Sequence, residues 1–285
     1  MATIKPILKY PGAKWLIADW VISCLPATPF YIEPYCGSAA VWFTLWDAGL
    51  GWPRYAVLND LEGEIGNLFR VMRNDLDRLC LLVTCTPWSR EEYIAVRDAA
   101  APADDPTERA RRYLVQLWQG HGSGTGGRST VAWRHQGVQG MRANVWTWKG
   151  WNALPNRLAH AAQALKCVEV ETRPALDVIT AYREPDVLLY VDPPYIGSTR
   201  NGSLYRHEQR DEASHVRLLD ALDQHPGPVA LSGYHCALYD DRLARWYATE
   251  KSTLAEKGNI RTEVLWLNPV CVERLGYGPL FQEQR

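Results

Sequence analysis

Val187-Leu188-Leu189-Tyr190-Val191-Asp192-Pro193-Pro194-Tyr195 is the stretch on which the interpretation of the whole chain depends. Its first five residues are uncharged and apolar or aromatic, which predicts a strand buried on both faces, as in the parallel sheet of an α/β domain. Ligands bind just beyond the carboxyl ends of such strands. There Asp192 offers a carboxylate, Pro193 and Pro194 fix the backbone, and Tyr195 presents an aromatic face. We therefore predict a site for a planar ring that carries an amino group, with an ordinary proline turn as the alternative.

The composition limits what kind of protein this is. A chain of 285 residues that is 47% hydrophobic and 22% charged fits one large α/β domain with an insertion, or two domains. A net charge of −1 means that nucleic-acid binding needs a local basic patch. Seven cysteines form no C-x-x-C pair, so we expect reduced thiols and neither a zinc site nor disulfides. We find no signal-peptide pattern and no uncharged run long enough for a membrane span, so we expect a cytoplasmic protein.

A second candidate site follows the first predicted strand. Residues 30–35 read as a strand, and residues 36–40 (CGSAA) as a tight turn into a helix that ends near Asp47. Small side chains let a ligand approach the backbone, which is typical of a nucleotide-type cradle. The turn matches neither G-x-G-x-x-G nor a P-loop, so phosphate binding is disfavoured. Asp60, at the tip of the next strand, stands where such folds place the acid that binds ribose hydroxyls. An N-cap of the following helix is the plainer role for Asp60.

The remaining pattern alternates helices and strands. A capping box at Ser89-Arg90-Glu91-Glu92 opens one helix. The other expected helices cover about 15–24, 61–72, 107–119, 174–182, 211–223 and 240–247, and the other strands 55–58, 168–171, 229–231 and 263–268.

The segment from 87 to 166 differs from the rest of the chain in charge. No aspartate or glutamate occurs between Arg109 and Val168, whereas nine lysines and arginines and five tryptophans do. Cations that replace counterions and rings that stack on bases are what DNA binding requires. A solvated basic face around a small tryptophan core is the alternative. From this segment we predict DNA contacts by Arg128, Arg134, Arg142 and Lys149.

Taken together, these motifs resemble the DNA adenine methyltransferases of the Dam type, in the phage and prophage branch of the family's alpha group. The resemblance is carried by Lys9-Tyr10-Pro11-Gly12-Ala13-Lys14, by Ile32-Glu33-Pro34-Tyr35-Cys36-Gly37-Ser38, by Asn59-Asp60, by Asp192-Pro193-Pro194-Tyr195, by Ser232-Gly233-Tyr234, and by the strand at 261–266. It spans most of the chain except the middle segment. Tyr10 replaces a frequent Trp, and Ala39 replaces a frequent Gly.

The resemblance implies a Rossmann-like α/β sheet, with a catalytic domain in two parts, 1–86 and 167–285, around a mainly helical target-recognition insertion at 87–166. It implies methyl transfer from S-adenosylmethionine to N6 of a flipped-out adenine in double-stranded DNA, with no metal, membrane or obligate protein partner. The implied catalytic residues are Asp192, Pro193, Pro194 and Tyr195. Those implied to bind the cofactor are Tyr10, Lys14, Glu33, Pro34, Cys36, Gly37, Ser38, Asp60 and Asp192.

Two other functions fit the same motifs. One is methylation of cytosine N4 or of an RNA adenine, because the tetrapeptide indicates an amino group more firmly than it indicates a ring. The other, from a different class, is a catalytically inactive DNA-binding protein that keeps the fold as a scaffold. An aspartate at position 192 favours adenine within the resemblance.

Overall fold

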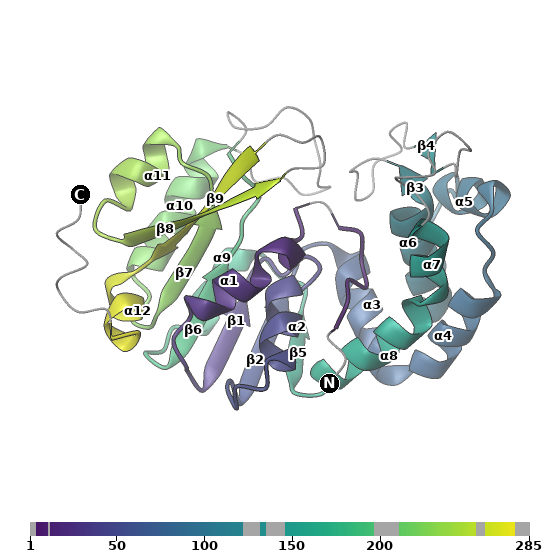
Figure 1. Cartoon of the computed structure of the whole chain (residues 1–285), viewed down its shortest axis with the longest axis horizontal. Coiled ribbons are helices and arrows are strands. Elements are labelled where there is room, and N and C mark those ends of the chain that lie inside the picture. Colours follow the sequence, from purple (N-terminus) through teal and green to yellow (C-terminus); the bar gives the residue numbers. More distant parts are fainter. Residues whose placement is uncertain are drawn as a thin grey trace. The chain divides into compact units, whose positions relative to one another are not determined.

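A computed structural model of the chain describes residues 4–10, 12–121, 132–134, 146–196, 211–254 and 260–276. These residues divide into an α/β unit and a helical unit (Figure 1). The α/β unit comprises Lys14–Leu61, Cys167–Gly202 and His207–Arg285, and the helical unit comprises Met1–Ala13, Glu62–Lys166 and Ser203–Arg206. The predicted insertion, 87–166, lies inside the longest segment of the helical unit, which runs from Glu62 to Lys166.

The α/β unit is built on a seven-stranded sheet with the order β5-β2-β1-β6-β7-β9-β8. The first five strands in this order are parallel, and β9 runs antiparallel to both β7 and β8. The strand order reverses between β1 and β6, which is where open α/β sheets bind ligands. The strands are β1 (Phe30–Glu33), β2 (Tyr55–Asn59), β5 (Val168–Glu171), β6 (Val187–Val191), β7 (Val229–Gly233), β8 (Tyr247–Leu254) and β9 (Ile260–Leu267).

Helices cover both faces of the sheet (Figure 1), and the central strands β6 and β7 are buried throughout. In β1, Ile32 joins the apolar cluster that includes residues of α9 and α10. The preceding Tyr31 points to the opposite face, since side chains alternate along a strand, and its ring stacks on Trp42 of α2 with centroids 5.9 Å apart. The helices of this unit are η1 (Lys14–Leu16), α1 (Ala18–Ser23), α2 (Ala40–Asp47), α9 (Ala175–Ala181), α10 (Glu212–Asp223), α11 (Ala237–Arg242) and α12 (Pro269–Arg274).

The strand β6 confirms the prediction made from its sequence. All five of its residues are buried, and it pairs with β1 on one side and β7 on the other, in the register Leu189 opposite Ile32 and Leu189 opposite Val229. Five consecutive apolar residues are needed because neither face of this central strand meets water. Asp192 is the first residue beyond the strand, so the tetrapeptide begins at the carboxyl edge of the sheet.

The prediction of a helix at 240–247 was wrong. The helix is α11, which ends at Arg242, and Tyr247 already begins β8. The register of β8 and β9 runs from Tyr247 opposite Leu267 to Leu254 opposite Ile260. This long antiparallel pairing overrides the local helical pattern, as tertiary contacts commonly do.

The helical unit contains six helices among the described residues. Ser89 caps α5 by accepting a hydrogen bond from the Glu92 backbone N–H, as the capping box predicts, and Asp105 caps α6 through Thr107. No helix of the described residues is long and apolar enough to cross a membrane. The elements of the unit are α3 (Gly63–Asn74), α4 (Leu76–Cys85), α5 (Arg90–Arg97), α6 (Pro106–Gln119), α7 (Trp146–Asn152), α8 (Leu154–Ala164) and the short pair β3 (Gly120–His121) and β4 (Ala132–Trp133).

Candidate active site

Asp192 is the centre of the candidate site at the carboxyl end of β6. Its Oδ1 lies 2.9 Å from Nζ of Lys14, which begins η1, and both side chains are largely buried. Lys14 Nζ also donates to the Tyr195 hydroxyl at 2.7 Å, and that oxygen lies 3.4 Å from Asp192 Oδ1. Acid, lysine and tyrosine therefore form one compact cluster. The sequence assigned Lys14 to the cofactor, whereas the structure places it against the candidate catalytic acid.

The electrostatic environment of Asp192 makes its carboxylate a strong acceptor. Burial raises the pKa of Asp192 above its ordinary value, because the charged form loses hydration. The Lys14 ammonium group opposes this by lowering the pKa, and the nearby carboxylate of Glu263 raises it again. A buried carboxylate with a raised pKa binds a hydrogen-bond donor more tightly than a solvated carboxylate does.

Two residues that the sequence analysis did not assign complete this cluster. Glu263 on β9 accepts the Tyr195 hydroxyl at Oε2 (2.8 Å) and the Tyr234 hydroxyl at Oε1 (3.0 Å). The rings of Tyr195 and Tyr234 lie in contact, with centroids 4.5 Å apart. Both residues stood in motifs of the resemblance, but only as strand markers. The only local signal was the hydroxyl-bearing ring of Tyr234 directly after a buried strand, and nothing local marks Glu263 on β9.

The turn between β1 and α2 forms the second part of the site. Gly37 and Ala39 have positive φ values of 49° and 52°, so the chain reverses tightly here. The Gly37 backbone N–H donates to Asp60 Oδ2 at 2.9 Å, which ties the turn to the tip of β2. Asn59 holds the same region by donating from Nδ2 to the carbonyl of Pro34 at 2.8 Å. The predicted proximity of the turn and Asp60 is therefore present in the α/β unit.

Three other predicted residues of this turn are buried. Ser38 and Cys36 are 2% and 7% exposed, and burial raises the pKa of the Cys36 thiol well above its usual range. A thiol kept protonated in this way is a poor nucleophile, which agrees with the absence of any need for a cysteine in the chemistry. Glu33 is 2% exposed and accepts the Tyr31 hydroxyl at 2.6 Å.

Glu33 makes the stability of the fold depend on pH. Burial raises its pKa to about 8, and the Asp192 carboxylate contributes in the same direction. The native state therefore keeps a proton that the unfolded chain releases near pH 4.5. We expect the free energy of unfolding to fall between about pH 5 and 8, and Glu33→Gln to reduce that fall by on the order of a few kcal/mol.

Denaturant unfolding at pH 5, 7 and 9 measures this effect. Glu273→Gln on α12 is the control, because Glu273 is exposed and its substitution should leave the pH dependence unchanged. A Glu33→Gln protein that loses stability with pH as steeply as the unmodified protein would contradict the assignment.

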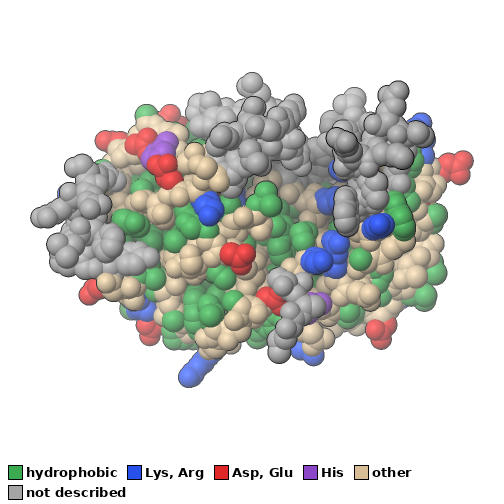
Figure 2. Space-filling view, viewed as in Figure 1, with side chains coloured by type: hydrophobic (Ala, Val, Ile, Leu, Met, Phe, Trp, Pro, Cys, Tyr) green, Lys and Arg blue, Asp and Glu red, His purple; other side chains and the backbone are tan. Residues whose placement is uncertain are grey.

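The helical unit carries a cluster of cations around Trp118. Lys9 Nζ lies 4.6 Å from the centroid of the Trp118 ring, and the guanidinium carbon of Arg157 lies 5.5 Å from a ring centroid of Trp118. Burial, followed by the charges of Arg134 and Arg157, lowers the pKa of Lys9 to about 8. Lys9 and Arg157 therefore lie over the Trp118 ring, and Arg134 lies near enough to Lys9 to complete a cluster of three cations. Figure 2 shows lysine and arginine side chains gathered on this unit.

The predicted DNA contacts are separated by the structure. Arg134 belongs to the cluster around Trp118, whereas Lys149 on α7 lies 5.8 Å from a ring of Trp148. Arg128 and Arg142 lie outside the described residues. Tyr10 belongs to the helical unit, as does Lys9.

The absence of acids between 109 and 168 overstates the charge of this segment. Arg109 pairs with Glu64 at 2.8 Å, and Arg111 pairs with Glu92 and Glu108, each at 2.6 Å. These acids precede the segment in sequence and reach it through the folding of α3, α5 and α6. A linear count of charges cannot register such partners.

Two of the five tryptophans are core residues, as the alternative interpretation allows. Trp118 and Trp151 are 2% and 3% exposed, and their indole N–H groups donate to the carbonyls of Ile7 and Thr86. Trp148 is 41% exposed. A buried, hydrogen-bonded indole cannot stack on a base, so Trp148 is a better candidate than either for contact with DNA.

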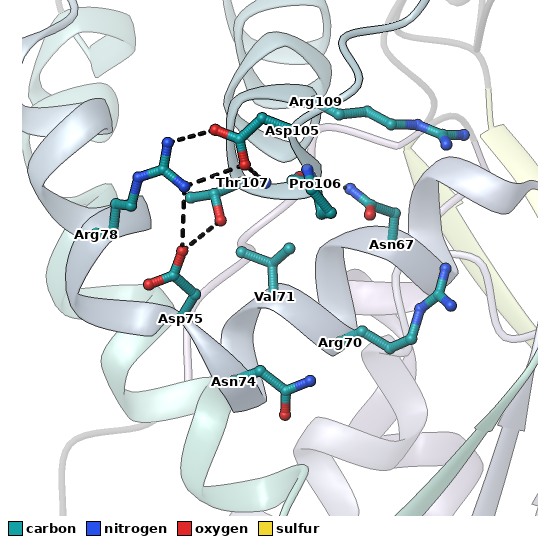
Figure 3. A pocket seen from close by; sticks show the side chains of 10 residues that line it. All are labelled: Asn67, Arg70, Val71, Asn74, Asp75, Arg78, Asp105, Pro106, Thr107 and Arg109. Carbon is teal, nitrogen blue, oxygen red and sulfur yellow. Dashed lines mark hydrogen bonds and ion pairs between the residues drawn. The ribbon is translucent and has the colours of Figure 1, made fainter.

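A cavity of about 510 Å³ also lies in the helical unit, between α3, α4 and the start of α6 (Figure 3). Arg78 of α4 donates to both carboxylate oxygens of Asp105, the residue that caps α6. Asp75 accepts the hydroxyl of Thr107 and lies 3.5 Å from Arg78. These interactions join the helix ends to one another. The cavity is therefore lined by a structural network rather than by groups arranged for chemistry.

The described residues contain no group of three or more histidines, cysteines or acids arranged to hold a metal ion. The sheet order, and a buried acid at the point where that order reverses, define a Rossmann-like α/β enzyme.

Comparison with known families identifies which kind of enzyme this is. Residues 10–257 match the D12 class N6 adenine-specific DNA methyltransferases. The chain belongs to this family and is an adenine-specific DNA methyltransferase. The match confirms the resemblance to Dam-type enzymes, while its phage and prophage branch stays a prediction.

Comparison with curated protein sequences finds no match. Two solved structures of the rRNA methyltransferase aviRa from Streptomyces viridochromogenes are similar to the chain, each at 16% identity and a TM-score of 0.39. The 2.4 Å structure is matched over 95% of this chain and 90% of that chain, and the 1.5 Å structure over 96% and 93%.

Proposed function

We propose that the chain transfers a methyl group from S-adenosylmethionine to N6 of an adenine that is flipped out of double-stranded DNA. The observation that carries this proposal is the buried Asp192 at the end of β6, held by Lys14 and next to Tyr195. It supports recognition of an amino group on a planar ring, because a carboxylate accepts the amino hydrogens while an aromatic ring stacks on the base.

The donor set of the turn after β1 fits an adenosine-type cofactor. Asp60 offers a carboxylate at the tip of β2, where ribose hydroxyls are bound in doubly wound folds, and Gly37 lets the backbone approach a ligand. We assign the binding of S-adenosylmethionine to these two residues together with Glu33, Cys36 and Ser38. Pro34, Tyr10 and Lys14 are assigned to it on the resemblance alone.

Bound S-adenosylmethionine would supply an electrophilic sulfonium methyl group. The chain must then make the adenine amino group nucleophilic, since its lone pair is conjugated into the ring. Asp192 Oδ and the carbonyl of Pro193 would accept the two amino hydrogens and favour the tetrahedral nitrogen that attacks. When the bond from nitrogen to the methyl group forms, the sulfur–methyl bond would break to leave a neutral thioether, and the nitrogen would release one proton to solvent. Burial raises the pKa of Asp192, and the Lys14 ammonium group opposes this by favouring the ionised carboxylate. Placement and preorganised acceptors supply most of the acceleration, and no covalent enzyme intermediate is needed.

Contact with DNA is assigned to the helical unit. Lys9, Arg134 and Arg157 around Trp118 concentrate positive charge that a phosphate group would neutralise. Extruding the base costs a few kcal/mol, and stacking on Tyr195 would return roughly 1–3 kcal/mol. We assign Arg128, Arg142 and Lys149 to the same role from the sequence.

Mass spectrometry of nucleosides tests the proposal. The purified enzyme is incubated with S-adenosylmethionine and, separately, with duplex DNA, single-stranded DNA and RNA. N6-methyladenine in duplex DNA is the expected product. N4-methylcytosine, or methylation of RNA alone, would replace the proposed substrate. Absence of any product, together with no cofactor binding in calorimetry, would favour an inactive DNA-binding protein.

A further inference from the structure

Tyr234 and Tyr195 follow the carboxyl ends of the neighbouring parallel strands β7 and β6. Tyr234 directly follows β7, and Tyr195 lies four residues beyond the end of β6, with Val191 opposite Leu231 in the register of these strands. Their ring centroids are 4.5 Å apart, with the ring planes inclined at 56°. Two aromatic rings therefore meet at the edge of the sheet where Asp192 lies.

Glu263 fixes both tyrosines through their hydroxyl groups. Its Oε2 accepts from Tyr195 at 2.8 Å and its Oε1 accepts from Tyr234 at 3.0 Å, so each ring uses a different carboxylate oxygen. The Glu263 side chain is 12% exposed and comes from β9, which pairs with β7. Lys14 Nζ lies 3.9 Å from Glu263 Oε2. A charged carboxylate held this way restrains both rings more firmly than a neutral acceptor would.

The space beside these rings is too small for a base. The cavity lined by Tyr195, Ile196, Tyr234, Cys236 and Tyr239 has a volume of about 10 Å³, which suffices for about one water molecule. A planar base stacked between two rings needs van der Waals contact on both of its faces, about 3.5–4.0 Å each. Rings with centroids 4.5 Å apart must therefore separate before a base can lie between them.

We propose that Tyr234 forms the second aromatic wall of the base pocket, and that Glu263 is a positioning residue that latches Tyr195 to Tyr234 while no base is bound. This inference rests on the proposed function and specifies how its substrate is received. Entry of the base separates the rings and replaces their mutual contact with stacking on both faces of the base. One tyrosine hydroxyl then leaves Glu263, while the other keeps its wall in place.

Substitutions of Tyr234 test whether its ring stacks on the extruded base. The probe is duplex DNA with 2-aminopurine at the adenine that the unmodified enzyme methylates, and its fluorescence reports base extrusion. Tyr234→Phe keeps the ring and loses only the hydroxyl that Glu263 holds, so extrusion should equal that of the unmodified enzyme or exceed it by up to several-fold. Tyr234→Ala removes one stacking face and should lower the equilibrium constant for base extrusion by about tenfold or more. Cofactor affinity and the unfolding midpoint of both variants should be unchanged.

The outcomes separate this inference from the proposed function. If Tyr234→Ala and Tyr234→Phe extrude the base equally and the unmodified enzyme methylates duplex DNA, then Tyr234 does not stack on the base. The proposed function is unaffected by that result. An unmodified enzyme that methylates no duplex DNA overturns both.

Glu263→Gln tests the latch through the pH dependence of kcat/KM. Among the described residues, the ionisable groups that interact with Asp192 are Lys14, Glu263, Tyr195, Glu33, Tyr190 and Tyr239. Of these, the Glu263 carboxylate raises the pKa of Asp192. Removing that charge should move the acid limb of the profile to lower pH and should increase extrusion of 2-aminopurine several-fold. Exposed Glu273→Gln is the matched control. An acid limb that stays in place, with extrusion unchanged, overturns the role of Glu263.

Discussion

Asp192→Ala should lower kcat for DNA methylation by at least about 10²- to 10³-fold, the cost of losing one preorganised polar group at a reacting centre. The structure explains why the loss should be this large. Asp192 is the acid at the carboxyl end of the central strand β6. Its side chain is only 18% exposed, and this partial burial strengthens its hydrogen bonds. Asp192→Asn, which keeps the shape but loses the charge, should be impaired nearly as much.

Binding and folding controls make this result interpretable. Removing one partner of a buried ion pair is ordinarily destabilising, but Lys14 has Glu263 within 3.9 Å as a second carboxylate. The unfolding midpoint of the Asn variant should therefore stay close to that of the unmodified enzyme, and calorimetry should still detect binding of S-adenosylmethionine through the other residues assigned to it. Turnover within tenfold of normal in a folded, cofactor-binding variant would remove Asp192 from the chemistry.

The parallel core of the fold was predictable because its strands are locally distinctive. The five uncharged residues of β6 predict a strand buried on both faces, and the small residues that begin at Cys36 predict a tight turn into a helix, which starts at Ala40. By contrast, β8 was missed because its stability comes from pairing with β9 along its full length. Such pairing is a property of two distant segments, and no local pattern reveals it.

The candidate site was predictable residue by residue but not as an arrangement. Asp192 and Tyr195 were found from their position after a buried strand. Lys14 was found from a motif, which does not show that its ammonium group lies on Asp192 across 178 residues of sequence. Glu263 escaped notice because a single acid on a strand near the end of the chain has no local signature. Its importance comes only from the two hydroxyls that converge on it.

Reversing the charge of Arg134 should weaken binding of duplex DNA on the order of tenfold at 0.1 M salt, without changing cofactor affinity. Each lost phosphate contact should reduce the magnitude of the negative slope of log K for DNA binding against log salt concentration by about 0.9. Arg134→Glu places an acid beside Lys9 and Arg157, which would then be neutralised within the protein rather than by DNA. Because Arg134 Nε also donates to the Gly120 carbonyl, Arg134→Gln should be compared for stability.

Lys9 should make the affinity for duplex DNA depend on pH. Its pKa of about 8 means that it is mostly charged at pH 7 and mostly neutral at pH 9, whereas Arg134 and Arg157 stay charged throughout. DNA binding should therefore take up a proton, and affinity should fall as the pH rises from 7 to 9. Lys9→Met should bind more weakly at pH 7 and should lose most of this dependence.

A matched control distinguishes the effect of the cation cluster around Trp118 from the effect of net charge on DNA binding. Arg70 is an exposed arginine of α3 in the same helical unit, next to the cavity of Figure 3 and apart from Trp118. Arg70→Glu changes the net charge by the same amount as Arg134→Glu, so long-range electrostatics should affect both variants equally. Only Arg134→Glu should reduce the magnitude of the salt slope by about 0.9, the value for one phosphate contact. Equal slopes for the two variants would mean that net charge, rather than the cluster around Trp118, determines binding.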